Sequence, residues 1–302
     1  MYVRYFGLKE MPFTITPDTS FFFAHPVHQE ALNTLLIAVR LGEGFIKVTG
    51  EVGTGKTLIC RKLLAALEND SKVFTAYIPN PYLSPTALLG AIADELGVRV
   101  LRNREPHHLL KQLTAALLEI HKKGRRVVLC LDEAQAMPVA TLEALRLLSN
   151  LETEKRKLLQ VVLFGQPELD VKLADPSIRQ LLQRITFSCR LAPLRLRDIR
   201  YYVAHRLSIA GHSGGPVFSM PAIWRLARAS RGIPRIVNIL SHKAMLAAFG
   251  EGSRRVRLRH VREAAQDTES TVSSSFGQSR YMVTVLAALL VSVGALLWMR
   301  AR

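Results

Sequence analysis

The sequence predicts an α/β fold, a parallel β-sheet covered by helices, followed by a smaller all-helical domain and one C-terminal transmembrane helix. Three observations predict it. Apolar runs of strand length alternate with helical spacing up to residue 190, helical spacing alone continues beyond Pro193, and residues 282–299 carry no charge. At 302 residues the chain is long enough for one α/β domain and a smaller one.

The first 192 residues alternate strands and helices. The expected helices are 28–41, 56–67, a helix that begins at Ser84-Pro85, 105–122 and 138–153, and the expected strands are 45–49, 73–78, 127–131, 158–164 and 186–190. Ser84 suits the N-cap and Pro85 the first helical position. This alternation is typical of a parallel sheet with helices on both faces.

The remaining chain lacks strand signals. Helical stretches are expected at 195–211, 219–230, 234–249 and 257–267. We therefore expect a core domain at 1–192, a helical domain at 193–268, a polar linker at 269–280 and a membrane helix at 281–299.

The membrane helix is predicted from length and flanks. Residues 282–299 would span about 27 Å as a helix at ~1.5 Å per residue, against a hydrocarbon core of about 30 Å. Tyr281 and Trp298 suit the two interfaces, and arginines flank the segment. The N-terminus has no apolar stretch of the signal-peptide kind. We expect an anchored chain with membrane lipid as a partner.

A phosphate-binding motif lies between the strand at 45–49 and the helix at 56–67. It reads G-x-x-x-x-G-K-T and comprises Gly50, Glu51, Val52, Gly53, Thr54, Gly55, Lys56 and Thr57. Backbone N–H groups of such a loop hold phosphate oxygens at a helix N-terminus. Lys56 supplies a positive charge to the β/γ-phosphates, and the Thr57 hydroxyl is placed to bind Mg²⁺. The motif predicts nucleotide binding.

An acidic pair follows the apolar strand at 127–131. Asp132 would lie at the carboxyl end of a parallel strand, where α/β sheets bind ligands, and is expected to hold Mg²⁺. Glu133 is the expected general base for an attacking water. With the phosphate loop, this pair predicts ATP hydrolysis.

Charge is concentrated in the helical region. Residues 193–267 contain thirteen arginines and one lysine against four acidic residues, an excess of ten within a total net charge of +17. A polyanion, either nucleic acid or anionic lipid, would suit this region, and an arginine-rich surface without a dedicated ligand is the alternative. The three cysteines show no metal or disulfide spacing, which fits a reducing compartment.

Several further motifs carry a family resemblance. They are Phe6-Gly7-Leu8, Pro12-Phe13, Thr16-Pro17-Asp18, HQEAL at 28–32, GEVGTGKT at 50–57, LDEAQ at 131–135, FGQPEL at 164–169 and GIPR at 232–235. On these residues the chain resembles the AAA+ ATPases of the general secretion pathway protein A (ExeA) group, and within it most resembles the branch of MSHA pilus biogenesis. The resemblance covers residues 1–268. It implies a five-stranded P-loop core, a helical lid, ATP and Mg²⁺ as ligands, and ATP-dependent homo-oligomers with nucleotide at subunit interfaces.

The resemblance also implies roles for residues that the two motifs do not assign. Gln166 corresponds to the polar sensor that orients water, with a turn residue before Pro167 as the alternative. Arg235 corresponds to the lid arginine that reaches the phosphates, with an ordinary surface arginine as the alternative. His28 and Gln29 lie where the adenine pocket of the family begins.

An arginine finger that reaches the neighbouring subunit is implied as well. Arg184 matches its position, and Arg179 is the competing candidate. A finger supplied in trans accelerates hydrolysis by about 10³–10⁵ in GTPase systems.

The expected function is a membrane-anchored ATPase that assembles an envelope machine, an MSHA or other type IV pilus or a type II secretion apparatus. Its place would be the bacterial inner membrane, crossed once, with the ATPase domain in the cytoplasm and inner-membrane assembly proteins as partners. Relatives commonly carry a periplasmic peptidoglycan-binding domain after the membrane helix, whereas this sequence stops at Arg302. We therefore expect a partner to make cell-wall contact.

Two alternatives differ in class. One is a DNA-binding AAA+ ATPase of the transposition or replication-loading kind, whose basic lid would bind phosphate backbones. The other is a regulatory nucleotide-binding scaffold, against which Glu133 argues.

Overall fold

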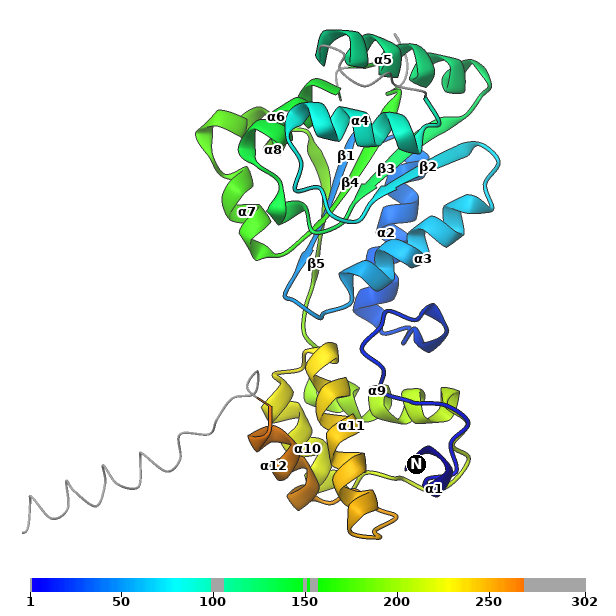
Figure 1. Ribbon diagram of the computed structural model, residues 1–302, viewed down its shortest axis with the longest axis vertical. Helices are drawn as coiled ribbons and strands as arrows, with labels where there is room; N and C mark the ends of the chain where they lie inside the picture. Colours follow the sequence, from blue (N-terminus) through cyan, green and yellow to red (C-terminus); the bar gives the residue numbers. More distant parts are fainter. Residues whose placement is uncertain (1, 99–105, 149–150, 153–156, 269–302) are drawn as a thin grey trace, which may run out of the picture.

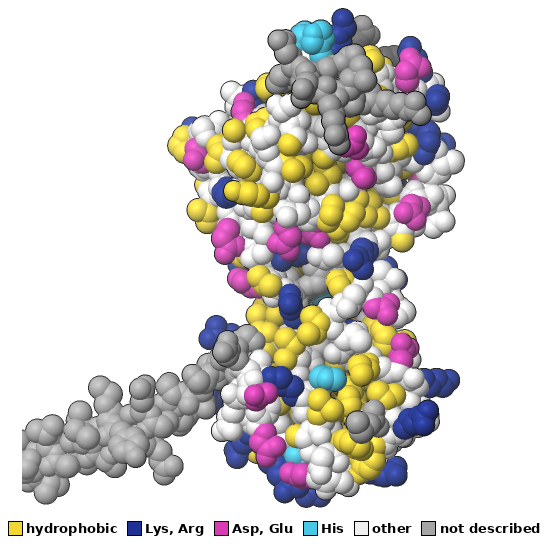
Figure 2. Space-filling view, in the orientation of Figure 1, with side chains coloured by type: hydrophobic (Ala, Val, Ile, Leu, Met, Phe, Trp, Pro, Cys, Tyr) yellow, Lys and Arg dark blue, Asp and Glu magenta, His cyan; other side chains and the backbone are white. Residues whose placement is uncertain are grey.

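The computed structural model describes residues 2–98, 106–148, 151–152 and 157–268. They form an upper lobe built on a β-sheet and a lower lobe of helices, which meet at a narrow waist (Figures 1 and 2). The linker predicted at 269–280 and the membrane helix predicted at 281–299 lie outside the described residues. Within the described ranges, no helix has the length and apolarity that crossing a bilayer requires.

The sheet lobe contains five parallel strands, as the sequence predicts. They are β1 (Phe45–Gly50), β2 (Val73–Ile78), β3 (Arg126–Leu131), β4 (Leu159–Gly165) and β5 (Ile185–Leu191). Their order across the sheet is β2-β3-β4-β1-β5, and each neighbouring pair is parallel. Strand β1 therefore lies between β4 and β5, and its carboxyl end leads directly into the phosphate-binding motif.

Helices cover both faces of the sheet because side chains of successive strand residues point to opposite faces. In β3, Val127, Leu129 and Leu131 pack on one side, and Val128 and Cys130 pack on the other. The first side carries α4 (Pro85–Glu95), α5 (Pro106–Lys122), α6 (Val139–Leu148), α7 (Pro167–Leu173) and α8 (Arg179–Leu182). The second carries α2 (Pro26–Leu41) and α3 (Lys56–Glu68) (Figure 1). Short 3₁₀ turns lie at η1 (Thr19–Phe21), η2 (Ala134–Ala136) and η3 (Pro176–Ile178).

The helical lobe is a bundle of α9 (Leu196–Ile209), α10 (Met220–Ser230), α11 (Pro234–Gly250) and α12 (Leu258–Gln266). Each begins within a few residues of its expected start. Ser219 caps α10, with its hydroxyl oxygen facing the Ala222 N–H, and Pro234 occupies the first turn of α11. The bundle shares one apolar core that is separate from the two cores of the sheet lobe.

The N-terminal segment belongs to this helical core, which corrects our expectation of a core domain at 1–192. Helix α1 (Tyr2–Tyr5) lies beside the bundle. The chain that follows it runs along the helical lobe to the start of α2 (Figure 1). The buried apolar residues of this segment are Tyr2, Phe6, Leu8, Phe13 and Phe21, and all of them join the core of α9–α12.

A buried arginine explains this attachment. Arg206 of α9 is 6% exposed; its guanidinium donates to the Pro12 carbonyl and lies 4.5 Å from the centroid of the Phe21 ring. Asn238 of α11 donates to the Thr14 carbonyl at 3.2 Å. A buried guanidinium needs acceptors, and the N-terminal backbone supplies them.

Candidate nucleotide-binding site

The loop from Gly50 to Thr57 connects β1 to α3 and curls around the first turn of that helix. Gly53 and Gly55 have φ angles of 82° and 102°, in the left-handed region that favours glycine. The turn directs backbone N–H groups of the loop and of the first turn of α3 toward one point, the arrangement that holds phosphate. The loop therefore has left-handed glycines between a strand and a helix N-terminus, as the phosphate-binding prediction requires.

Lys56 is buried at the base of this loop. The residue is 5% exposed. Its Nζ donates to the carbonyl oxygens of Gly50 at 2.7 Å and of Glu51 at 3.0 Å. Burial lowers the pKa of the ammonium, and the carboxylates of Glu133 and Asp132 oppose that shift. The cationic group therefore lies between the loop and the acidic pair.

Asp132 directly follows β3 and is 3% exposed. Thr57 Oγ1 donates to Asp132 Oδ2 at 2.7 Å, and the Glu133 N–H donates to Asp132 Oδ1 at 3.0 Å. Burial raises the pKa of this carboxyl, and the Thr57 hydrogen bond counteracts the rise. The hydroxyl of Thr57 and the carboxylate of Asp132 are adjacent oxygen donors, a set that fits Mg²⁺ with substrate phosphates and water completing its shell.

Glu133 stands beside Asp132 in an unusual backbone conformation, with φ 54° and ψ 37°. Its Oε2 accepts a hydrogen bond from Gln166 Nε2 at 3.0 Å and another from Gln135 Nε2. Gln166 follows β4 and begins α7, so two neighbouring strands bring the predicted base and the predicted sensor together. Two amide donors fix the carboxylate of Glu133.

Gln135 is a site residue that our sequence reasoning did not assign. Its Oε1 accepts from the Gln166 N–H at 3.0 Å, so one side chain connects Glu133 to Gln166. Behind it, Lys172 Nζ donates to the Gln135 carbonyl at 2.5 Å and to the Met137 carbonyl at 2.9 Å. The sequence contained a signal, because Gln135 ends the LDEAQ motif, but the motif does not reveal the contact.

His28 contacts the phosphate loop, whereas Gln29 does not. His28 Nε2 lies 2.9 Å from the Thr54 carbonyl. Burial lowers the pKa of this imidazole. A carbonyl can only accept, so Nε2 carries the proton and donates. Gln29 is exposed, and its amide donates to Asn33 Oδ1 at 3.1 Å. The predicted adenine-contact roles of both residues stay predictions.

The helical lobe reaches the loop through Arg235. The Arg235 N–H donates to the Gly53 carbonyl at 3.2 Å, and a Cβ added at Gly53 would lie 2.5 Å from the Arg235 Cβ. The Arg235 side chain is exposed at the start of α11. The start of α11 therefore lies against the phosphate loop, as the sensor prediction requires, and the direction of its guanidinium toward a nucleotide stays a prediction.

The two candidate finger residues lie away from this loop. Arg184 directly precedes β5, where Ile185 pairs with Phe45, whereas the loop follows the other end of β1, where Gly50 pairs with Leu191. Its Nη1 donates to the Arg146 carbonyl at 3.4 Å. Arg179, at the start of α8, is exposed. Arg184 is therefore not brought into the phosphate site of its own chain.

Comparisons with known proteins place the loop within a recognised domain. The profile of an AAA domain matches residues 39–173. General secretion pathway protein A of Aeromonas hydrophila is 42% identical over 302 residues, which cover 97% of this chain and 53% of that protein. The chain therefore spans about half the length of this relative.

Solved structures share the fold. Cdc6p from Pyrobaculum aerophilum has a TM-score of 0.65 at 22% identity, covering 83% of this chain and 71% of that chain. The ORC1 protein of Aeropyrum pernix, in complex with DNA, has a TM-score of 0.61 at 21% identity, covering 85% and 69%. At such identities the likeness concerns the fold alone. The phosphate loop and the acidic pair lie within the residues that match an AAA domain, and almost the whole chain is similar in sequence to general secretion pathway protein A.

Proposed function

We propose that this ATPase is anchored in the bacterial inner membrane and couples ATP binding and hydrolysis to assembly of an envelope machine. The observation that carries the proposal is the 42% identity to a secretion-pathway protein over 97% of this chain. The apolar segment at 282–299 supports anchoring, with the ATPase lobe in the cytoplasm where ATP is available. The finer resemblance, to the MSHA pilus biogenesis protein MshM, stays a prediction.

Binding of ATP follows from the loop. Its N–H groups and Lys56 would hold the phosphates, and Thr57 with Asp132 would hold Mg²⁺, which supplies charge neutralisation at the β- and γ-phosphates. Lys56 now donates to the carbonyls of Gly50 and Glu51, so nucleotide phosphates would replace these acceptors. The arriving anion favours the charged form of Lys56 against its burial.

Hydrolysis follows from Glu133. Its carboxylate would take a proton from the attacking water, and Gln166 would orient that water through its amide. Gln135 bonds to the Glu133 carboxylate and to the Gln166 N–H, and so fixes the position of one residue relative to the other. Arg235, on the first turn of α11, would stabilise charge on the transferred phosphoryl group and make lobe position sensitive to the nucleotide.

Assembly follows from the location of Arg184. Six residues of β1 separate its end of the sheet from the phosphate loop, about 15–20 Å at ~3.3 Å per residue. An arginine side chain does not cover that distance. Any role of Arg184 in hydrolysis therefore requires a second subunit, and we propose an ATP-dependent homo-oligomer with inner-membrane assembly proteins as further partners.

DNA binding is the second candidate. The helical region carries ten positive charges in excess, and Lys and Arg side chains are frequent along the lower rim of that lobe (Figure 2). Phosphate backbones and anionic headgroups both attract such a surface. The secretion-protein relative and the apolar segment favour the envelope role.

The test separates these two functions. Cell membranes that contain the full-length protein are extracted with carbonate and, separately, with detergent, and the ATPase rate is measured with and without duplex DNA. We expect extraction by detergent only and little stimulation by DNA. Release by carbonate together with strong DNA-stimulated turnover would overturn the envelope role and support DNA binding.

A further inference from the structure

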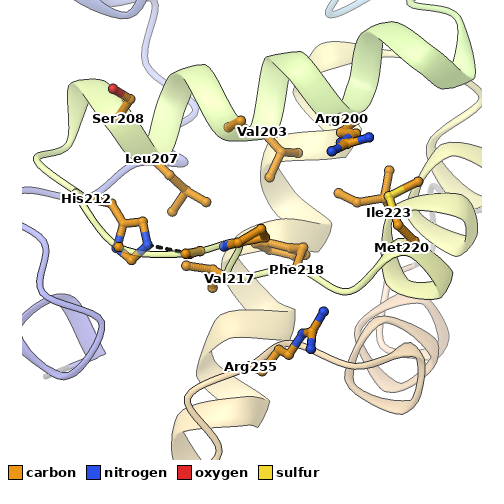
Figure 3. A pocket seen from close by; sticks show the side chains of 14 residues that line it. Arg200, Val203, Leu207, Ser208, His212, Val217, Phe218, Met220, Ile223 and Arg255 are labelled. Carbon is orange, nitrogen blue, oxygen red and sulfur yellow. Dashed lines mark hydrogen bonds between the residues drawn. The ribbon is translucent and has the colours of Figure 1, made fainter.

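A second cavity lies in the helical lobe, away from the phosphate loop. It has a volume of about 380 Å³, at the lower end of the range of ligand pockets, ~300–1,000 Å³. Its walls are α9, the start of α10 and the segment between them (Figure 3). Its apolar lining consists mainly of Val203, Leu207, Val217, Phe218 and Ile223. We call it the α9–α10 pocket.

Backbone contacts build this pocket and hold it open. After α9 the chain turns at Gly211, and the His212 ring lies 3.0 Å from the Phe6 carbonyl and 2.9 Å from the Gly215 carbonyl. The strand-like segment at Phe218 then pairs with Val256, whose N–H donates to the Val217 carbonyl at 2.8 Å. This pairing places the neighbouring Arg255 at the pocket. The cavity is a built feature, closed at one end by His212.

Two arginines also line the pocket. Figure 3 shows the guanidinium group of Arg200, from α9, near Ile223 and Met220, and that of Arg255 on the other side of the segment that carries Val217 and Phe218. Both side chains are exposed, and neither has an ion-pair or hydrogen-bond partner within the part of the chain that the structure describes. The nearby acid Glu251 is already bound to Arg259 and His260. The pocket therefore presents two uncompensated cations beside an apolar cavity.

Exposed apolar side chains extend the surface beyond the pocket. Met220 is 57% exposed, and Trp224, one helical turn further along α10, is 50% exposed with Arg228 stacked 4.9 Å from its ring centroid. On α9, Leu196 lies one turn before Arg200 and is 49% exposed. Trp, Met and Arg are the residue types enriched in protein interfaces. A small molecule inside the cavity would leave this band uncovered.

We propose that the α9–α10 pocket is the docking site for a partner protein that presents an acidic peptide with a large apolar side chain. The apolar side chain fills the cavity between Val203 and Phe218. Carboxylates of the peptide pair with Arg200 and with Arg255, because guanidinium groups bind carboxylates through two parallel hydrogen bonds. The flanking peptide covers Met220 and Trp224. This proposal does not depend on the secretion role.

The arrangement of charge beside an apolar cavity favours a peptide as the ligand of the α9–α10 pocket, rather than a phosphate backbone or a bilayer surface. The DNA backbone and the headgroup surface of an anionic bilayer present repeated phosphate charges to the protein, so they would use all exposed arginines of the lobe alike. A peptide uses Arg200 and Arg255 and leaves the arginines of α12, such as Arg262, outside the interface. The two kinds of ligand therefore differ in which arginines matter.

The test begins with selection. Random peptides of about a dozen residues, displayed on phage, are selected against the purified full-length protein at physiological ionic strength. We expect enriched sequences that place Asp or Glu next to Leu, Phe, Met or Trp. The affinity of one selected peptide, labelled with fluorescein, is then measured by anisotropy against variants of the full-length protein.

Two variants probe the pocket and two serve as matched controls. Ala204→Trp adds bulk at an exposed position of the pocket lining, and Arg200→Glu reverses one of the two charges. Each should lower the affinity for the peptide at least about tenfold, the loss expected when a charge-assisted hydrogen bond is removed or the cavity is blocked. Tyr201→Trp, on α9 outside the pocket, and Arg262→Glu, on α12, should change affinity less than about twofold. An unchanged ATPase rate shows that each variant is folded.

Three results would overturn the proposal. Selection could yield no acidic–apolar sequence, or the selected peptide could bind Ala204→Trp as well as the wild type. In the third, Arg200→Glu and Arg262→Glu would weaken the peptide equally, while both also weaken binding to phosphatidylserine vesicles or duplex DNA. That pattern would assign the basic face to phosphate-bearing ligands in general.

Discussion

Glu133 and its neighbours set the chemistry at the scale of single residues. Asp132 faces the Thr57 hydroxyl, and the adjacent Glu133, with a left-handed backbone, turns toward Gln135 and Gln166 instead. A residue other than glycine pays for this conformation, roughly 1–3 kcal/mol, and such strain is common at functional sites. The conformation directs the two adjacent carboxylates to different partners, which suits the proposed roles of Asp132 in holding metal and of Glu133 as the base.

The division of roles predicts the effect of Glu133→Gln. The amide keeps the shape of the side chain and cannot take a proton, so ATP with Mg²⁺ should still bind while turnover falls at least ~10²-fold. Lys56→Ala should instead weaken nucleotide binding, because the loop loses its charge. Fluorescent-nucleotide titration and phosphate release measure the two effects. Wild-type turnover in Glu133→Gln would refute the assignment of the base.

Gln135 should act as a positioning residue for Glu133. Without its amide, Glu133 keeps only the donor from Gln166, so Gln135→Ala should lower kcat by about tenfold and leave KM for ATP nearly unchanged. Gln135→Glu should lose more, because two carboxylates would then face each other. Gln183→Ala, at an exposed glutamine after α8, is the control. A change in KM without a change in kcat would contradict a positioning role.

At the scale of elements, the sequence predicted what local patterns encode. The five strands are short and mostly apolar, and Ser84 caps its helix as expected, with the hydroxyl oxygen 3.3 Å from the Ala87 N–H. The packing of Phe6 and Phe13 against α9–α12 was not predictable, because burial against residues about 200 positions away leaves no local signal. The role of Gln135 was not predicted for a similar reason: one of its two partners, Gln166, follows another strand and lies 31 positions away.

One element junction depends on a single glycine. Gly232 precedes α11 with φ 77°, and an added Cβ would lie 2.2 Å from the Leu194 carbonyl oxygen, just before α9. Gly232→Ala should lower the free energy of unfolding of the helical lobe by at least about 2 kcal/mol, from the left-handed backbone and the overlap together. It should also reduce ATPase activity, because Arg235 follows three residues later.

The measurement is urea unfolding followed by Trp224 fluorescence in a Trp298→Phe background, since these are the two tryptophans of the chain. Gly90→Ala is the matched control. Nothing lies within 4 Å of a Cβ at that helical glycine, so alanine should be neutral or stabilise by up to about 1 kcal/mol. Equal behaviour of the two variants would mean that the Leu194 contact is unimportant.

At the scale of the whole molecule, two lobes meet at the phosphate loop. The lower lobe contacts it through the Arg235 N–H and the Gly53 carbonyl, and the upper lobe contacts it through His28 and Thr54. Arg184 lies at the opposite end of the strands, where β1 and β5 begin. One chain therefore holds a phosphate loop at the carboxyl ends of the strands and a candidate finger at their amino ends, which suits head-to-tail assembly.

This arrangement predicts complementation between subunits. Arg184→Ala should bind ATP normally and hydrolyse it slowly, and mixing with Lys56→Ala, which still carries Arg184, should restore part of the activity. Arg179→Ala tests the competing residue under the same conditions. ATPase rates are measured across protein concentrations. A rate strictly proportional to concentration, with no recovery on mixing, would exclude a finger in trans.

The attachment of the N-terminal segment has a consequence for biosynthesis. The Tyr2 hydroxyl meets His242 Nδ1 at 2.9 Å, 240 positions later in the chain. At about 5–20 residues per second, the ribosome needs roughly 12–48 s to make that partner. The sheet lobe is synthesised first, up to β5. Until α9–α12 have been made, the aromatic side chains of the N-terminal segment have no core in which to be buried. Slower translation between β5 and α12 therefore prolongs the time for which these apolar side chains are exposed.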